Sequence, residues 1–314
     1  MAVKSCASLL IGLMLWIFAG CSQSGVRAGQ GYVSVPGGRV WYRIVGSGQA
    51  TPLVLLHGGP GGTSRGLRPL EALADERPVV FYDQLGCGRS DRPDDKSLWR
   101  VERFVEELQT LRDELGLKRV HILGHSWGSM LAVDYLLTRP DGVKSLILAG
   151  PAVSIPRYLE DVKALRAKLP QNIQDILARH EAAGTTDSKE YQDAATVFYR
   201  RHLCRLDPWP PEMSMTDSSF GTEVYNVMWG PSEFFATGIL KDYDRTSQLG
   251  TLRLPVLFTA GRYDETTPEQ AEWYRSLVPN ARLVIFEQSG HMTMLDEADR
   301  YIQVVREFLR EVER

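Results

Sequence analysis

Short apolar runs recur through the first half of the chain, and they constrain its fold more than any other feature of the sequence. Four of them occur before residue 150, at residues 52–56, 78–82, 120–123 and 143–149. Runs of this length are typical of strands that are buried on both faces of a parallel sheet. Helical patterns separate them, at residues 67–75, 101–115 and 127–138. This alternation predicts an α/β fold with a mostly parallel central sheet flanked by helices.

The pattern changes in the middle of the chain. Residues 152–247 are helical and aromatic and contain no clear strand-like run. Strand-like runs return at 255–260 and 282–287, and helical patterns lie near 268–277 and 298–312. A hairpin pattern at 31–35 and 39–45 precedes the first buried run. We therefore expect a core in two parts, residues 31–151 and 248–314, with an inserted helical cap at 152–247.

The N-terminus has the pattern of an export signal. Lys4 precedes an apolar stretch at residues 9–19, which is too short to span a bilayer because a spanning helix needs about 20 residues. The sequence FAGC at 18–21 resembles the lipobox of bacterial lipoproteins, which implies lipidation of Cys21. We expect a signal peptide at 1–20, a tether at 21–30, and an exported protein held by a lipid anchor at the periplasmic side or the outer membrane. The alternative is a plain secretory signal with an incidental cysteine.

Charge and cysteine content exclude several classes of protein. Lys and Arg total 36 and Asp and Glu total 39, so the net charge is −3 and no basic face for nucleic acid is expected. The four cysteines, at positions 6, 21, 87 and 204, form no C-x-x-C motif and no run with histidine. We therefore expect neither a metal site nor a disulfide framework.

The strongest chemical signal is the pentapeptide GHSWG at residues 124–128, which has Ser126 at its centre. It directly follows the run 120–123 and opens a helical pattern. The motif G-x-S-x-G between a strand and a helix is typical of a nucleophile elbow, a sharp turn that leaves no room for side chains at its two glycines. The turn raises the serine hydroxyl above the carboxyl edge of the sheet. The sequence therefore predicts that Ser126 is a catalytic nucleophile.

A serine nucleophile needs a base, and the base needs an orienting carboxylate. Among the six histidines, His291 follows the strand-like run 282–287 on a loop that leads to the last helical pattern. Asp264 follows the run 255–260. Both loops lie at the carboxyl ends of strands, where open α/β sheets build their sites. We predict a catalytic triad of Ser126, Asp264 and His291.

The negative oxygen formed during such a reaction needs backbone N–H donors. The glycine-rich loop HGGPG at 57–61 follows the run 52–56, and glycine allows the backbone to approach a substrate closely. We assign the donors to the N–H groups of Gly59 and Trp127. A phosphate-binding loop is the alternative, but the G-K-[ST] sequence of such loops does not occur there.

Several segments together resemble the proline iminopeptidase family of α/β hydrolases. They are HGGPG at 57–61, DQLGCGRS at 83–90 and GHSWG at 124–128. The cap stretch EVYNVMWGPSEF at 223–234 and DETTP at 264–268 resemble the tricorn-interacting aminopeptidase branch of that family. The similarity extends from about residue 31 to the C-terminus. It implies an α/β-hydrolase fold, no cofactor, and a serine aminopeptidase that releases proline or another small apolar residue from the N-terminus of short peptides.

The resemblance also implies roles for residues outside the triad. An aminopeptidase binds a protonated α-amine, and a buried ammonium group needs carboxylate partners. The resemblance implies that these partners are Glu233 on the cap and Glu265 beside the triad acid. It implies a pocket for the first residue of the substrate that is lined by Tyr225, Trp229 and Phe234. We expect the segment 83–90 to pack beneath the site as scaffold.

Two other functions remain open at this point. The first is an esterase or amidase of the same fold that acts on small non-peptide acyl compounds. An epoxide hydrolase or dehalogenase is disfavoured, because those enzymes have Asp where this chain has Ser126. The second is a surface binding lipoprotein without activity, which would have a broken triad or a filled oxyanion loop. The sequence contains neither defect.

Overall fold

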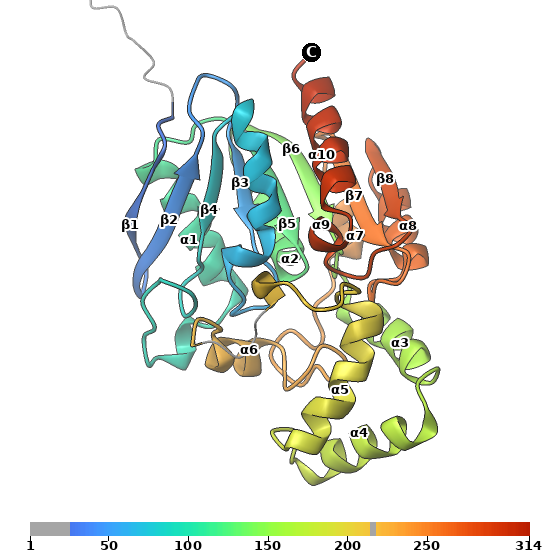
Figure 1. Cartoon of the computed structure of the whole chain (residues 1–314). Helices are drawn as coiled ribbons and strands as arrows, with labels where there is room; N and C mark the ends of the chain where they lie inside the picture. Colours follow the sequence, from blue (N-terminus) through green and yellow to red (C-terminus); the bar gives the residue numbers. More distant parts are fainter. Residues whose placement is uncertain (1–25, 214–217) are drawn as a thin grey trace, which may run out of the picture.

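The structure, a computed structural model, describes residues 26–213 and 218–314, and an eight-stranded sheet forms its centre (Figure 1). The strand order is β1-β2-β4-β3-β5-β6-β7-β8. The β1–β2 and β2–β4 pairs are antiparallel, and every pair from β4 to β8 is parallel. The strands are β1 (Gly29–Val35), β2 (Gly38–Val45), β3 (Leu53–Leu56), β4 (Val79–Tyr82), β5 (Val120–His125), β6 (Val143–Ala149), β7 (Val256–Gly261) and β8 (Ala281–Phe286).

The central strands are apolar throughout because both faces of the sheet are covered. In β3, Leu53 and Leu55 belong to one buried cluster, whereas Val54 and Leu56 belong to the other. Successive side chains of a strand point to opposite faces. A strand that is buried on both sides therefore needs an apolar residue at each position, and the alternation of polar and apolar residues disappears.

Helices cover the two faces in the manner of a doubly wound sheet. On one face, the 3₁₀ helix η1 (Ser64–Asp75) packs against α10 (Ala298–Val312), which follows the short α9 (Thr293–Asp296) (Figure 1). On the other face lie α1 (Val101–Glu114), α2 (Trp127–Leu137) and α8 (Pro268–Leu277). A single 3₁₀ turn, η2 (Lys96–Leu98), precedes α1.

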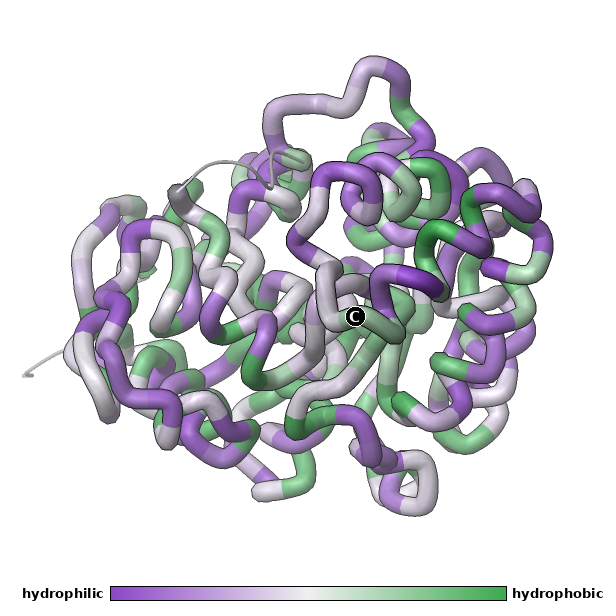
Figure 2. The backbone as a smooth tube through the Cα atoms, turned by 90° about the horizontal axis from the view of Figure 1, so that it is seen from below, coloured by the Kyte–Doolittle hydropathy of each residue, from purple (hydrophilic) through white to green (hydrophobic). Residues whose placement is uncertain are grey.

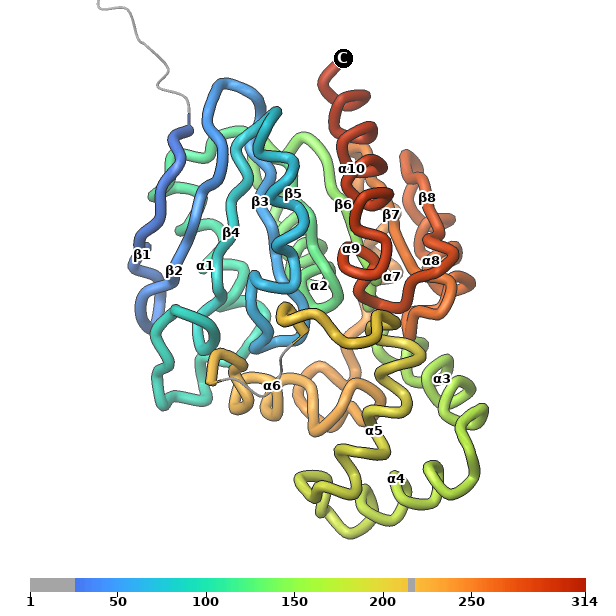
Figure 3. The backbone as a smooth tube through the Cα atoms, viewed as in Figure 1, coloured from blue at the N-terminus to red at the C-terminus, as the bar shows by residue number. Residues whose placement is uncertain are grey.

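Most of the cap lies beyond the carboxyl ends of the parallel strands (Figure 3). The described residues between β6 and β7 form α3 (Ile155–Arg166), α4 (Gln171–Ala183), α5 (Lys189–His202), η3 (Pro211–Met213), α6 (Thr222–Met228) and α7 (Thr246–Leu249). The two ends of this insertion lie side by side. The Ile155 N–H donates to the Tyr243 carbonyl at 2.9 Å, and the Arg245 N–H donates to the Val153 carbonyl at 2.9 Å.

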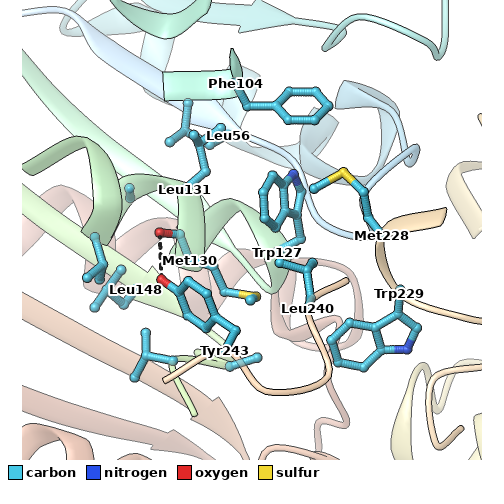
Figure 4. Packing of buried hydrophobic residues seen from close by; sticks show 14 of the residues in the cluster. Leu56, Phe104, Trp127, Met130, Leu131, Leu148, Met228, Trp229, Leu240 and Tyr243 are labelled. Atoms are coloured by element: carbon cyan, nitrogen blue, oxygen red, sulfur yellow. Dashed lines mark hydrogen bonds between the residues drawn. The ribbon is translucent and has the colours of Figure 1, made fainter. Parts of the chain in front are cut away.

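The cap shares its hydrophobic core with the sheet. Trp127, at the start of α2, belongs to the same buried cluster as Met228 and Leu240 of the cap, and Figure 4 shows its ring directed toward them. The Tyr243 hydroxyl donates to the Met130 carbonyl of α2 at 3.3 Å (Figure 4). Because the cap packs directly on the helix that follows the nucleophile motif, the cap position and the site position are fixed together.

The outer helices change repeatedly between hydrophilic and hydrophobic residues along their turns (Figure 2). This pattern is typical of helices that bury one side against a core and expose the other. Among the described residues, none of the helices combines the length and the apolar character that crossing a bilayer requires. The predicted signal peptide, and Cys21 with it, lie outside the described residues.

The α/β-hydrolase fold predicted from the sequence is confirmed, and each predicted strand lies within two residues of the observed one. One helix differs in type. The segment predicted as a helix at 67–75 is a 3₁₀ helix that begins at Ser64 and contains Pro69. Proline has no N–H group and therefore removes one hydrogen bond from an α-helix at that point.

Candidate active site

Ser126 stands on a strained turn between β5 and α2. Its φ of 54° and ψ of −121° are rarely adopted by a residue with a side chain. Two glycines permit this turn by allowing backbones to touch. A Cβ at Gly124 would lie 2.2 Å from the Gly128 carbonyl oxygen, and a Cβ at Gly128 would lie 2.1 Å from the Leu56 carbonyl oxygen. Both glycines of the motif are therefore required by the packing of the turn.

The histidine and aspartate predicted from the sequence are in contact. His291, on the loop between β8 and α9, donates its Nδ1–H to Oδ1 of Asp264 at 2.7 Å. The same oxygen accepts the Thr266 N–H at 2.8 Å, which holds the carboxylate in place. With Nδ1 carrying the proton, Nε2 is free to accept one. Nε2 has no hydrogen-bond partner among the described residues, and His291 lines the same two cavities as Ser126.

Gly150, at the end of β6, is a part of the site that the sequence analysis missed. It has a φ of +50°, and a Cβ there would lie 2.6 Å from both Nδ1 and Cε1 of His291. The His291 imidazole therefore packs directly against the backbone at Gly150, where a side chain would not fit. A glycine directly after the predicted strand 143–149 was the available signal, but nothing in the sequence linked it to His291.

His125 supports the imidazole from the other side. Its ring centroid lies 4.6 Å from that of His291, and its Nε2–H donates to the His291 carbonyl at 3.2 Å. Burial lowers the pKa of His125 well below its ordinary value, and the nearby His291 lowers it further. His125 is therefore neutral at neutral pH and acts as a packing and hydrogen-bonding partner.

The electrostatic surroundings of His291 favour its protonated form. Burial alone would lower its pKa, but Asp264 opposes this by charge and by hydrogen bond, and Glu265 and Glu233 add to the effect. Together they raise the pKa to about 9. Such an imidazole holds a proton strongly once it has taken one from a nucleophile.

The two predicted oxyanion donors are the N–H groups of Gly59, in the glycine-rich loop, and Trp127, at the start of α2. Gly59 lines both cavities beside Ser126 and has a φ of +44°, a conformation that glycine adopts readily. Trp127 is the first residue of α2, so its N–H has no acceptor within the helix. These two N–H groups can bind a negative oxygen that forms above Ser126.

The segment 83–90 connects the glycine-rich loop at 57–61 with the turn that carries Ser126. The sequence predicts this segment as scaffold beneath the site. Gln84 accepts the indole N–H of Trp127 at 2.8 Å and donates its side-chain amide to the His57 carbonyl at 3.2 Å. The glycine loop and the nucleophile turn are thus joined through one buried side chain. The Cys87 thiol of this segment is not a competing nucleophile, because burial raises its pKa well above the ordinary value.

Two cavities meet at the reactive side chains. Ser126, His291, Gly59 and Glu233 line both of them. The inner cavity has an empty volume of about 270 Å³, part of it open to solvent, and is also lined by Trp127, Tyr158, Trp229 and Glu265. The outer cavity encloses about 730 Å³ and lies between the glycine loop, η1 and the second half of the cap.

The inner cavity contains two buried carboxylates, from Glu233 and Glu265. Burial raises the pKa of Glu233, and burial together with the charge of Glu233 raises the pKa of Glu265 well above its ordinary value. Oε2 of Glu265 has no hydrogen-bond partner among the described residues. No Lys or Arg is among the described residues that line this cavity. Such a cavity favours a small cationic group.

The three predicted pocket aromatics have different surroundings. Trp229 lines the inner cavity and packs edge-to-face on Tyr158, with ring centroids 5.5 Å apart. The Tyr225 hydroxyl donates to Oε1 of Glu233 at 2.8 Å, so Tyr225 orients that carboxylate instead of lining either cavity. Tyr158 is a lining residue that the sequence analysis missed, because an aromatic on a cap helix is usually core.

The expectation for Phe234 needs correction. Phe234 packs among aromatic rings of the cap, with its centroid 5.0 Å from that of Phe198, and the Arg166 guanidinium lies over its ring. It is not among the described residues that line either cavity. Since Glu233 is its neighbour in the chain, Phe234 holds the cap segment that carries the carboxylate.

The site offers no constellation for a metal ion. No group of three or more His, Cys, Asp or Glu side chains within the described ranges 26–213 and 218–314 could hold one. The structure brings Ser126, the hydrogen-bonded pair of His291 and Asp264, and the residues Gly59 and Trp127 to one site, and such a set of groups can perform acyl transfer.

We predict that Gly150→Ala leaves the protein folded but lowers kcat for p-nitrophenyl butyrate by about 100-fold or more, because a displaced catalytic group loses its geometry. The measurement is steady-state ester hydrolysis, with circular dichroism as the check on folding. Gly184→Ala is the matched control, because Gly184 also has a positive φ, of 67°, but has no atom within 4 Å of the added Cβ. Equal losses in the two variants would contradict contact with His291 as the cause.

We also predict the pH dependence of the same reaction. The base must be neutral, so kcat/KM is lost as pH falls through the pKa of His291, and this limb lies above the ordinary value of 6.5. Glu265→Gln removes one of the charges that raise this pKa and therefore moves the limb to lower pH. Glu287→Gln, on an exposed carboxylate paired with Arg262, is the control and leaves the limb unchanged. An unmoved limb in Glu265→Gln would show that the two side chains do not interact.

Comparison with known proteins agrees with this site. Residues 51–298 match the family model described as the alpha/beta hydrolase fold. A proline iminopeptidase of Heyndrickxia coagulans is 46% identical over 285 residues, which cover 90% of this chain and 99% of that protein. The crystal structure of a proline iminopeptidase from Mycobacterium smegmatis is 35% identical and has a TM-score of 0.83, over 90% of this chain and 98% of that one.

An esterase from Exiguobacterium antarcticum is less similar. It is 25% identical and has a TM-score of 0.65, although it covers 89% of this chain and 98% of its own. The iminopeptidases therefore match this chain better than this esterase does, over the same length. The chain belongs to the proline iminopeptidase family of α/β hydrolases.

Proposed function

We propose that the chain is a serine aminopeptidase that releases the N-terminal residue, proline or another small apolar residue, from short peptides. The observation that carries this proposal is the inner cavity, in which Glu233 and Glu265 lie beside Ser126 and His291. An esterase for neutral acyl groups gains nothing from two buried carboxylates, because each costs several kcal/mol of desolvation. A protonated α-amine compensates for that cost.

The first half of the proposed reaction forms an ester on the enzyme. The Ser126 hydroxyl oxygen attacks the carbonyl carbon of the first residue, and its proton passes to Nε2 of His291. Asp264 holds the imidazole and stabilises its charged form. The N–H groups of Gly59 and Trp127 bind the negative oxygen of the tetrahedral intermediate. The C–N bond then breaks as His291 returns the proton to the leaving amine.

The second half releases the amino acid. A water molecule gives a proton to His291 and attacks the ester carbonyl carbon. The tetrahedral intermediate then collapses, and the Ser126 oxygen leaves and takes the proton back from His291. The enzyme returns to its starting state, and the overall reaction consumes one water molecule.

The lining of the inner cavity supports removal of a single residue. The space of about 270 Å³ is bounded by Tyr158 and Trp229, which pack against each other. A longer chain on the acyl side of the scissile bond would place uncharged backbone, instead of an ammonium group, beside Glu233 and Glu265. Apolar walls around a small space favour proline or another small apolar side chain at this position.

We propose a finer family assignment as well. The cap sequence at 223–234, which carries Tyr225, Trp229 and Glu233, supports a place in the tricorn-interacting aminopeptidase branch. The alternative of a binding lipoprotein without activity is disfavoured, because Ser126, Asp264 and His291 are all present and Gly59 lines both cavities beside Ser126.

The amine-binding role gives a direct prediction. Glu233→Gln keeps the shape of the side chain but removes its charge, so the ratio of kcat/KM for prolyl-β-naphthylamide to that for p-nitrophenyl butyrate is expected to fall by about 100-fold. The lower pKa of His291 in this variant affects both substrates alike and leaves that ratio unchanged. Glu190→Gln, on an exposed cap carboxylate paired with Arg179, is the control and changes neither. If both substrates lose activity equally in Glu233→Gln, the amine does not bind there. A wild-type enzyme that prefers the ester by orders of magnitude would indicate an esterase.

We propose that the chain is exported and held at a membrane by a lipid on Cys21. The support is the sequence alone, namely Lys4, the apolar stretch 9–19 and the FAGC motif. In a bacterial host, the full chain is expected to incorporate labelled palmitate and to fractionate with membranes. Cys21→Ala is expected to abolish the label, whereas Cys6→Ala keeps it. A wild-type chain that is cleaved but never labelled would indicate a plain secretory signal.

A further inference from the structure

The outer cavity is a second, larger space at the reactive side chains, and its walls are mainly apolar. It encloses about 730 Å³. Its apolar lining residues come from five segments that lie far apart in the chain. They are Leu67 in η1, Leu203 at the end of α5, Met213 in η3, Phe220 before α6, and Met292 after His291. All of these except Phe220 are buried in the core. The reaction described above assigns no role to these residues.

The connection between the two cavities determines what each one receives. Ser126, His291 and Gly59 line both, so the scissile carbonyl lies at their junction. Glu265 lines only the inner cavity and Glu233 lies at the junction, so the amine and the first residue belong in the inner cavity. The part of the peptide beyond the scissile bond must then extend into the outer cavity. This step rests on the proposed aminopeptidase function.

We propose that the outer cavity is a binding site for a large apolar side chain on the second residue of the peptide. The enzyme would then select its substrates at two positions of the peptide. The inner cavity would select a small first residue with a free amine, and the outer cavity would select a bulky apolar second residue. Aliphatic and thioether walls gain free energy by burying an apolar side chain, and glycine at that position forgoes this gain.

The charges around the outer cavity disfavour an acidic second residue. No Lys or Arg is among the described residues that line it, and two carboxylates do, namely Glu212 and, at the junction with the inner cavity, Glu233. Glu212 is paired with Arg68, whose side chain is exposed, at 3.6 Å. His57 also lines the cavity, but burial lowers its pKa and its Nε2 accepts the Gln84 N–H at 3.0 Å, so it supplies no positive charge.

Gly66 provides a way to fill this cavity without disturbing the catalytic groups. It lines the outer cavity but not the inner one, and its backbone does not need glycine. An added Cβ would meet one atom within 4 Å, the mobile end of the Met292 side chain at 3.1 Å. A larger side chain at this position therefore extends into the cavity.

The first test uses the wild-type enzyme and a series of prolyl dipeptide amides that vary only in the second residue. The proposal predicts that kcat/KM rises about 10- to 100-fold from Pro-Gly-NH₂ to Pro-Leu-NH₂ and Pro-Phe-NH₂. Pro-Glu-NH₂ is expected to be no better than Pro-Gly-NH₂. Equal values across the series, or a preference for Glu, would overturn the proposal.

The second test uses Gly66→Leu. The variant is expected to lose at least 10-fold in kcat/KM for Pro-Phe-NH₂ but to keep its activity on prolinamide, whose leaving group is ammonia and does not reach the cavity. Gly29→Leu is the control, because the Cβ there has no atom within 4 Å, and it changes neither substrate. Equal effects of Gly66→Leu on both substrates would overturn the proposal.

The two proposals fail in different ways. If the wild-type enzyme hydrolyses prolinamide and all dipeptide amides at equal rates, the aminopeptidase function stands and the apolar site is wrong. If it hydrolyses p-nitrophenyl butyrate but no prolyl substrate, the aminopeptidase function itself is wrong, and the proposed site is wrong with it.

Discussion

The site depends on two close contacts between backbones, both at the turn that carries Ser126. The turn is possible because Gly124 lies against the first turn of α2 and Gly128 lies against the end of β3. Neither contact leaves space for a Cβ atom. The unfavourable φ of Ser126 is tolerated because the surrounding sheet and helix determine the path of the chain. The result is a hydroxyl that stands above the sheet edge next to the unpaired N–H groups of a helix start.

The other parts of the site are fixed to this turn. Trp127 joins the hydrophobic core of the cap, and its indole N–H reaches Gln84, which in turn holds the glycine loop. The cap therefore positions Glu233 relative to Ser126 through packing. The carboxylates that can receive an amine also act on His291, because both raise its pKa. Substrate binding and base strength are consequently linked through the same charges.

Much of the fold could be predicted from the sequence, because strands buried on both faces require continuous apolar runs and the observed strands lie within two residues of them. The triad positions followed from the order of the motifs at the carboxyl ends of strands. Gly150 and Tyr158 could not be found this way, since their roles depend on contacts between segments that lie far apart in the chain. Phe234 was misplaced for the same reason, because its neighbour Glu233 lines both cavities while Phe234 itself turns into the cap core.

Covalent labelling with a fluorophosphonate probe tests the central claim most directly, namely that Ser126 is an activated nucleophile. The serine oxygen forms a bond to phosphorus and fluoride leaves, so the product is stable and can be located by mass spectrometry after digestion. One adduct is expected, on the peptide that carries Ser126, with complete loss of activity and no adduct in Ser126→Ala. An active enzyme that carries the probe elsewhere, or a Ser126→Ala variant that retains activity, would contradict it.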